Sequence, residues 1–186
     1  MIITNNEEAL RIKCEDVLPD EIATIRLVLE AELDNANRLG KNGIGLAAPQ
    51  VGIPKKMAII RMGNSSRPEL NIDLVNATLT HGYDQAMVRD EGCLSFPGKL
   101  ENTLRFQEVH ITNNLVGSSS FIATGLLAIA IQHEIDHYNQ KLLFDRKAPT
   151  MIKMTGPKLE PNDPCWCGKI NVETGRPLKY KKCHAR

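Results

Sequence analysis

The chain has 186 residues, of which 42% are hydrophobic and 24% charged, with a net charge of +1, and this is the composition of an ordinary soluble globular protein. The longest nearly continuous apolar run, at 121–131, has 11 residues and is too short to span a bilayer. The first 13 residues lack the basic leader and apolar stretch of a secretory signal, so we expect a cytoplasmic protein without membrane insertion.

In chain order, the patterns predict a helix, several strands and a second helix. Apolar residues recur at every third or fourth position of 20–39, which is a helical spacing, and Gly40 is the expected stop. Short, partly β-branched segments bounded by Gly, Pro or Asn are expected to form strands at 57–62, 71–79 and 106–114. The second helix is expected from about Phe121 to Tyr138. This order is typical of an α+β fold rather than of alternating βαβ units.

The C-terminal part differs from the rest in charge. Residues 152–186 carry eight Lys or Arg and three Asp or Glu, a net +5, which leaves −4 for residues 1–151. Residues 155–164 contain three prolines and are predicted to link a domain of residues 1–154 to a small unit of residues 165–186. A basic tail is typical of proteins that meet a polyanion, although charge alone is as compatible with a solvated tail.

The segment "QHEIDH" places His133 and His137 four residues apart. On a helix the two side chains lie on one face and can bind one metal ion. Glu134, next to the first histidine, can accept a proton from a water molecule at that ion. The alternative is a surface histidine pair on an ordinary helix, which this spacing alone does not exclude.

An apolar face precedes the first histidine. Leu126, Ile129 and Ala130 share the helix face of His133, so an ion there would face an apolar surface, while the same residues also fit core packing. A catalytic site of this kind needs a third protein ligand and an open position. In "EGCLSFPG", Cys93 offers a thiolate, although a cysteine between Gly and Leu is also typical of simple burial.

A third segment, "GIGLAAPQVGIP" at 43–54, is rich in Gly and Ala and lacks the lysine of a phosphate-binding loop. Its small residues allow close backbone approach, and Gln50 offers an amide donor. The alternative is a tight turn between the first helix and the first strand.

These three segments, in this order and at this spacing, resemble the G-x-G-L-A-A-x-Q, E-G-C-L-S and H-E-x-x-H motifs of peptide deformylase. The resemblance spans about residues 1–150. It implies an α+β fold in which antiparallel β-sheets pack around a central metal-binding helix. It also implies a monomeric hydrolase that removes the formyl group from the N-terminal methionine of newly made proteins, with N-formylmethionyl nascent peptides as its partners.

By position, the resemblance makes Cys93, His133 and His137 the ligands of one catalytic divalent metal, with water at the fourth position. Glu134 becomes the general base and acid. Members of the family commonly hold Fe²⁺ and tolerate Zn²⁺ or other metals, whereas the two histidines and one cysteine by themselves favour zinc.

The resemblance also implies an oxyanion site and a substrate pocket. Gln50 and the backbone N–H of Leu94 would stabilise the oxyanion. The residues expected to flank the substrate backbone or line the methionine pocket are Ile44, Gly45, Leu126, Ile129 and Ala130. Asp136 is expected to pair with Arg105 and stiffen the metal helix.

Two positions near the expected peptide path depart from the family pattern. Leu100 stands where some bacterial members have an arginine, and Arg89 stands where many members have an apolar residue at the pocket rim. Neither position touches the chemistry.

The tail "PNDPCWCGKINVETGRPLKYKKCHAR" resembles the small zinc motif at the C-terminus of the SecA translocation ATPase. The implied ligands of this structural Zn²⁺ are Cys165, Cys167, Cys183 and His184, with fifteen residues between the second and third cysteines instead of the usual eight. So short a segment cannot fold without metal. The alternative is a disordered tail with free thiols; a folded tail would bind the ribosome or an export factor.

Two other function classes are considered. A zincin-type metalloprotease shares H-E-x-x-H but takes its third ligand as His or Glu downstream of the helix, and "YNQKLLFDRKAP" supplies neither. A catalytically dead binding module is disfavoured because every expected residue around the metal is present.

Overall fold

The structure is a computed structural model that describes residues 1–64, 67–114 and 119–149. The chain divides into two units, Met1–Ala148 and Pro149–Arg186. The predicted linker at 155–164 and the small unit at 165–186 lie outside the described residues. In the described ranges, no helix is long and apolar enough to cross a membrane.

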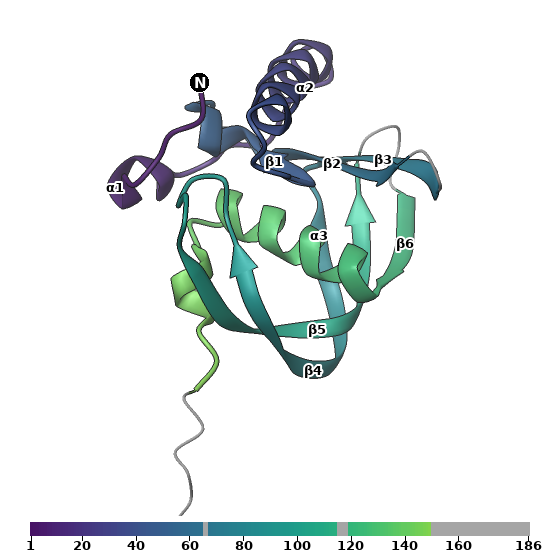
Figure 1. Ribbon diagram of the computed structural model, residues 1–186. Coiled ribbons are helices and arrows are strands. Elements are labelled where there is room, and N and C mark those ends of the chain that lie inside the picture. Colours follow the sequence, from purple (N-terminus) through teal and green to yellow (C-terminus); the bar gives the residue numbers. More distant parts are fainter. Residues whose placement is uncertain (65–66, 115–118, 150–186) are drawn as a thin grey trace, which may run out of the picture. The chain divides into compact units, whose positions relative to one another are not determined.

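The described residues of Met1–Ala148 form three α-helices and six antiparallel strands, which agrees with the predicted α+β class (Figure 1). The helices are α1 (Glu7–Leu10), α2 (Ile22–Arg38) and α3 (Gly125–Tyr138), with short 3₁₀ turns η1 (Ala48–Val51) and η2 (Leu143–Arg146). The strands are β1 (Gly45–Ala47), β2 (Met57–Asn64), β3 (Arg67–Val75), β4 (Thr78–Gly92), β5 (Leu100–Asn113) and β6 (Ser119–Thr124). They form two three-stranded sheets, β1-β2-β3 and β4-β5-β6.

Helix α3 lies between the two sheets, and Figure 1 shows β4 and β5 curling around the side of it that faces away from β2. Alternate residues of a strand point to opposite faces, and β2 uses both. Ala58 and Ile60 belong to the core that includes α3, whereas Met57 and Ile59 belong to the core beneath α2. The first sheet is therefore covered by a helix on each face.

Helix α2 forms where the apolar spacing predicted it. Ile25, Leu29 and Leu33 are buried against the first sheet. Gly40, with φ of +76°, follows the helix end in the left-handed conformation, which confirms it as the stop.

Three predicted boundaries were wrong. The strand expected at 106–114 begins six residues earlier, at Leu100. The second helix begins at Gly125, because residues 121–124 pair with β5 instead, Phe121 lying opposite Ile111. The strand expected at 71–79 is two strands, because Asn76 takes a φ of +48° and turns the chain. Its side chain stabilises that turn through Nδ2, which donates to the Val17 carbonyl at 3.0 Å.

The long hairpin of β4 and β5 carries a bulge close to the predicted motif residues. The pairing register shifts between Val88 and Glu91, and Asp90 within this interval has a φ of +53°. Bulges re-aim side chains, and here Glu91 is buried while Asp90 is exposed.

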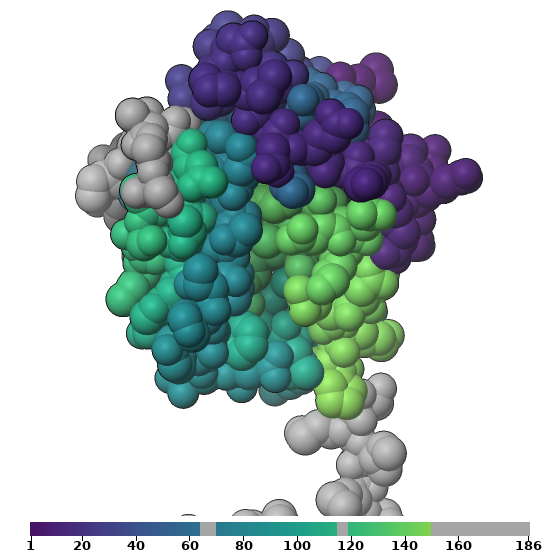
Figure 2. Space-filling model, turned by 180° about the vertical axis from the view of Figure 1, so that it is seen from behind, coloured from purple at the N-terminus to yellow at the C-terminus, as the bar shows by residue number. Residues whose placement is uncertain are grey.

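From behind, Figure 2 shows the teal surface of the strands beside the green surface of the segment that contains α3 and η2.

We expect Leu29→Ala to lower the free energy of unfolding by about 2–5 kcal/mol, because it leaves a cavity under the first sheet. Leu29 is 0% exposed, whereas Leu27 on the same helix is 67% exposed. Leu27→Ala is therefore the matched control, expected to change stability by about 0.5 kcal/mol or less. Denaturant unfolding of both variants measures the difference, and equal losses would contradict this packing of α2.

Candidate active site

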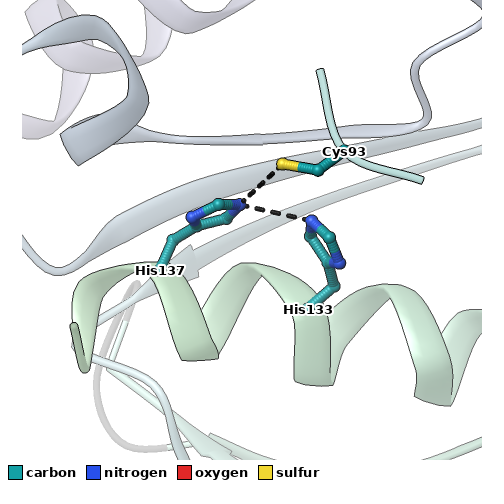
Figure 3. A group of neighbouring side chains, drawn as sticks. All are labelled: Cys93, His133 and His137. Carbon is teal, nitrogen blue, oxygen red and sulfur yellow. Dashed lines mark hydrogen bonds between the residues drawn. The ribbon is translucent and has the colours of Figure 1, made fainter. Parts of the chain in front are cut away.

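Three potential metal ligands converge between α3 and the segment that follows β4 (Figure 3). The Nε2 atom of His137 lies 3.4 Å from Cys93 Sγ and 3.2 Å from His133 Nε2. All three ligand atoms lie within 4.8 Å of one another. The one-turn spacing on α3 places the two rings side by side, as the sequence predicted.

These atoms fit a tetrahedral ion. Metal–nitrogen distances near 2.0 Å and metal–sulfur distances near 2.3 Å place neighbouring ligand atoms about 3.3–3.6 Å apart. Burial, together with the adjacent His133, lowers the pKa of His137 well below its usual value, so this ring is neutral and has a lone pair to offer. Without an ion, these three ligand atoms would lie close together with few hydrogen atoms available for hydrogen bonds between them.

Glu134 points toward the same space. The residue is 4% exposed, and its Oε2 atom has no hydrogen-bond partner. Burial raises the pKa of its carboxyl group to about 7, which outweighs the opposing effect of His133. A carboxyl group with this pKa can both accept and return a proton near neutral pH.

A cavity of about 520 Å³ brings the predicted residues of the substrate site together. Its lining includes Ile44, Gly45, Gln50, Cys93, Leu94, Leu126, Ile129, Ala130, His133 and Glu134. Arg89 and Leu100 line it as well. Leu126 is 57% exposed and Ala130 only 5%, so the apolar face of α3 runs from the surface to the buried end of the cavity.

Gln50 is held in a fixed orientation beside the thiol. Its Oε1 accepts the Ala47 backbone N–H at 2.8 Å, which fixes which way the amide points. Its Nε2 donates to Ser95 Oγ at 3.1 Å and lies 3.6 Å from Cys93 Sγ. A donor is therefore directed at the cavity from η1.

The sequence analysis missed the role of Glu91. Its Oε1 accepts from Nδ1 of His133 at 2.6 Å, and its Oε2 accepts from Thr103 Oγ1 at 2.5 Å. Arg105 donates to both carboxylate oxygens, at 2.6 and 2.9 Å. A carboxylate on Nδ1 directs Nε2 of the same ring toward a metal. The only signal was its place at the start of the "EGCLS" motif.

Asp136 and Arg105 lie together, with Arg105 Nη1 donating to the aspartate at 2.5 Å. Both are almost fully buried. Asp136 also accepts from Arg146 in η2, at 2.5 and 2.8 Å, a partner that the sequence did not indicate. The ion pairs therefore continue from the metal-binding ring through the helix to the end of the described chain.

The charges around His133 fix its protonation. Burial by itself lowers the pKa of this histidine, yet Cys93 and Glu91 raise it well above the usual value. Burial likewise acts to raise the pKa of Glu91, but hydrogen bonds from His133 and Arg105 hold it well below its ordinary range. Glu91 is consequently an anion that accepts a hydrogen bond from His133 Nδ1–H.

Comparison with known proteins agrees with these features. The polypeptide deformylase family model matches residues 1–152. The chain belongs to the polypeptide deformylase family. The peptide deformylase of Thermodesulfovibrio yellowstonii is 36% identical over 148 residues, which are 77% of this chain and 86% of that protein. A Helicobacter pylori peptide deformylase is 37% identical over 133 residues, which are 68% of this chain and 76% of that one.

Solved structures show the same fold. A probable peptide deformylase from Synechococcus phage S-SSM7 has a TM-score of 0.69 and 29% identity, covering 78% of this chain and 98% of that one. Peptide deformylase 1B of Arabidopsis thaliana has a TM-score of 0.65 and 32% identity, covering 80% and 81%. The Acinetobacter baumannii enzyme with Met-Ala-Ser bound has a TM-score of 0.64 and 27% identity, covering 78% and 96%.

The chain is a metal-dependent hydrolase that removes the N-formyl group from the N-terminal methionine of newly synthesised proteins, as its motifs predicted. The zincin-type alternative is not favoured. The predicted zinc ligands of the tail, Cys165, Cys167, Cys183 and His184, lie outside the described residues.

We expect Glu91→Gln to weaken binding of the catalytic metal about 10–100-fold, because the amide is a poorer acceptor for His133 Nδ1–H. Asp90→Asn is the matched control. Asp90 makes no ion pair in the described ranges, and asparagine tolerates its φ of +53°. Metal titration of metal-free protein against a chelator gives both affinities; unchanged affinity in Glu91→Gln would show that the ring needs no carboxylate.

Gly45→Ala is expected to abolish most activity without unfolding the protein. A Cβ atom on Gly45 would collide with the carboxylate of Glu134, which can swing away because it ends a flexible side chain. Displacing a reacting group by about 1 Å costs about 10²-fold in rate. We would measure kcat/KM, melting temperature and metal content together. Wild-type kcat/KM, or a collapse of the melting temperature, would contradict the prediction.

Proposed function

We propose that Cys93, His133 and His137 hold one catalytic ion, Fe²⁺ in the native enzyme, and that Glu134 moves the protons of the reaction. The observation that carries this proposal is the convergence of three ligand atoms beside a buried carboxylate with an unpaired oxygen. An ion held there supplies Lewis acidity. The family resemblance favours Fe²⁺ and the ligand set alone favours Zn²⁺, and anaerobic metal analysis distinguishes them.

Glu134 accepts the proton of the water that attacks the formyl carbon and then returns it to the leaving amine. Its raised pKa, about 7, matches this double role, because a group near the working pH performs both transfers. The buried position of the carboxyl group keeps bulk water from competing for the proton.

Gln50 and the backbone N–H of Leu94 bind the oxyanion that forms at the formyl oxygen. Support comes from the fixed Gln50 amide, whose Oε1 is already occupied by the Ala47 N–H and whose Nε2 faces the cavity. Ser95 Oγ accepts a hydrogen bond from Nε2–H until a substrate oxygen replaces it.

The methionine side chain packs on Leu126, Ile129 and Ala130, and Ile44 and Gly45 flank the substrate backbone. All five line the cavity, and three of them form one face of α3. The bound Met-Ala-Ser of the Acinetobacter relative supports this placement, since that peptide begins with methionine. Arg105 and Asp136 lie outside this pocket and stiffen helix α3, which carries the two histidines.

The C-terminal unit is proposed to hold one structural Zn²⁺ through Cys165, Cys167, Cys183 and His184. The motif resemblance and the net +5 of residues 152–186 support a zinc-stabilised basic module. This module brings the enzyme to ribosomes or to an export factor. The enzyme itself works as a cytoplasmic monomer on nascent chains.

We expect Glu134→Gln to keep the fold and the catalytic metal while lowering kcat about 10²–10⁴-fold, because the amide cannot accept a proton. The assay uses formyl-Met peptides, with acetyl-Met and internal-bond peptides as controls against protease activity. A metal-loaded variant that keeps more than about a tenth of wild-type kcat would remove Glu134 from the base role.

Truncation after Lys158 is expected to remove one zinc per chain and to leave deformylation of short peptides nearly intact. It should also weaken salt-sensitive ribosome binding, because it deletes most of the basic residues of 152–186. Cys165→Ser with Cys167→Ser in the full chain is the matched variant, since it removes zinc but keeps every Lys and Arg of the tail. Zinc analysis and ribosome co-sedimentation across a salt series measure both effects. Unchanged zinc in either variant would leave the tail without a metal site.

A further inference from the structure

Three cations border the mouth of the catalytic cavity: Lys41, Arg89 and Lys99, called the rim cations below. All three side chains are exposed. Within the described ranges, none of them takes part in an ion pair. The only exposed carboxylate in the cavity lining is Asp90. The mouth of the cavity therefore carries a net positive charge. The two other acidic residues of the lining, Glu91 and Glu134, are buried at the metal end of the cavity.

The rim cations come from three separate segments. Lys41 follows α2, Arg89 lies near the end of β4, and Lys99 lies in the connection between β4 and β5. The ammonium group of Lys99 lies 5.5 Å from the centroid of the Phe96 ring. The positive charges therefore surround the mouth from several directions. They do not form the single stripe that binding of a nucleic-acid backbone would require.

A bound substrate must pass this mouth. When the formylated methionine occupies the buried end, near Ala130 and Glu134, the following residues of the chain leave through the opening. The exposed Leu100, also at the rim, offers them an apolar contact but no counter-charge. Carboxylates on the second to fourth substrate residues would then lie among unpaired cations, whereas lysines there would be repelled.

We propose that the rim cations make this deformylase selective for formyl-Met chains with Asp or Glu at the second to fourth residues. The inference rests on the function proposed above, because only methionine bound at the buried end leads the chain past the rim. Exposed charge pairs are each worth a factor of about 1.5–5. Two acids compared with two lysines should therefore change kcat/KM by about tenfold.

The test compares kcat/KM for formyl-Met-Asp-Glu, formyl-Met-Ala-Ser and formyl-Met-Lys-Lys peptides at low and high salt. We expect the acidic peptide to be preferred over the basic one by about tenfold at low salt. At about 1 M salt the screening length falls to about 3 Å, and the preference should nearly vanish. A preference that survives high salt, or none at low salt, would overturn the proposal.

Charge reversal separates selectivity from folding. Arg89→Glu leaves two cations and two exposed carboxylates in the lining and should abolish the preference between the acidic and basic peptides, whereas misfolding lowers kcat/KM for all three peptides by the same factor. A combined Lys13→Gln, Lys56→Gln, Lys141→Gln variant removes three cations that do not line the cavity and should keep the wild-type ratio. An unchanged ratio in Arg89→Glu overturns the rim proposal alone, whereas a wild-type chain that hydrolyses no formyl-Met peptide overturns the function beneath it.

Discussion

The catalytic unit depends on one buried arginine. Arg105, 1% exposed, donates to Glu91 at the end of β4 and to Asp136 on α3. A buried guanidinium is costly unless it is paired, so the hairpin and the helix pack stably only where both carboxylates reach it. Removal of one partner from such a pair typically costs about 3–5 kcal/mol. That is a large share of the net stability of a small domain.

The same ion pairs set the geometry of the three potential metal ligands. Glu91 accepts a hydrogen bond from Nδ1–H of His133, and the ring therefore presents Nε2 to the space shared with Cys93 and His137. Cys93 follows Glu91 by two residues on the segment after β4, so the thiol and the orienting carboxylate arrive together. The ligand set thus comes from the packing of a hairpin on a helix, not from the helix alone.

The sequence indicated the candidate metal ligands and the candidate base better than the residues that hold them. His133 and His137 are one helical turn apart, Glu134 is next to His133, and Cys93 stands in a recognisable motif, so local patterns were enough. Glu91 contacts a histidine 42 residues away, and it faces inward only because of the bulge after Val88. No local pattern encodes such a contact.

The misplaced boundaries have the same origin. Residues 121–124 continue an apolar run into α3, and periodicity alone cannot separate a strand from a helix within such a run. Pairing with β5 decides it. Arg146, which joins Asp136 from η2, gave no signal at all, because a basic residue in a polar connection looks like any other.

Shared carboxylates also constrain how this sequence can drift over generations. Asp136 serves both Arg105 and Arg146, and Glu91 serves Arg105, Thr103 and a metal ligand. Replacing Arg105 leaves Glu91 and Asp136 without their shared buried cation, and substitutions of contacting residues of this kind are strongly non-additive. Lineages descended from this chain should therefore exchange these positions as a set or keep them all. Exposed positions that make no ion pair, such as Leu27 on α2, are free to vary one residue at a time.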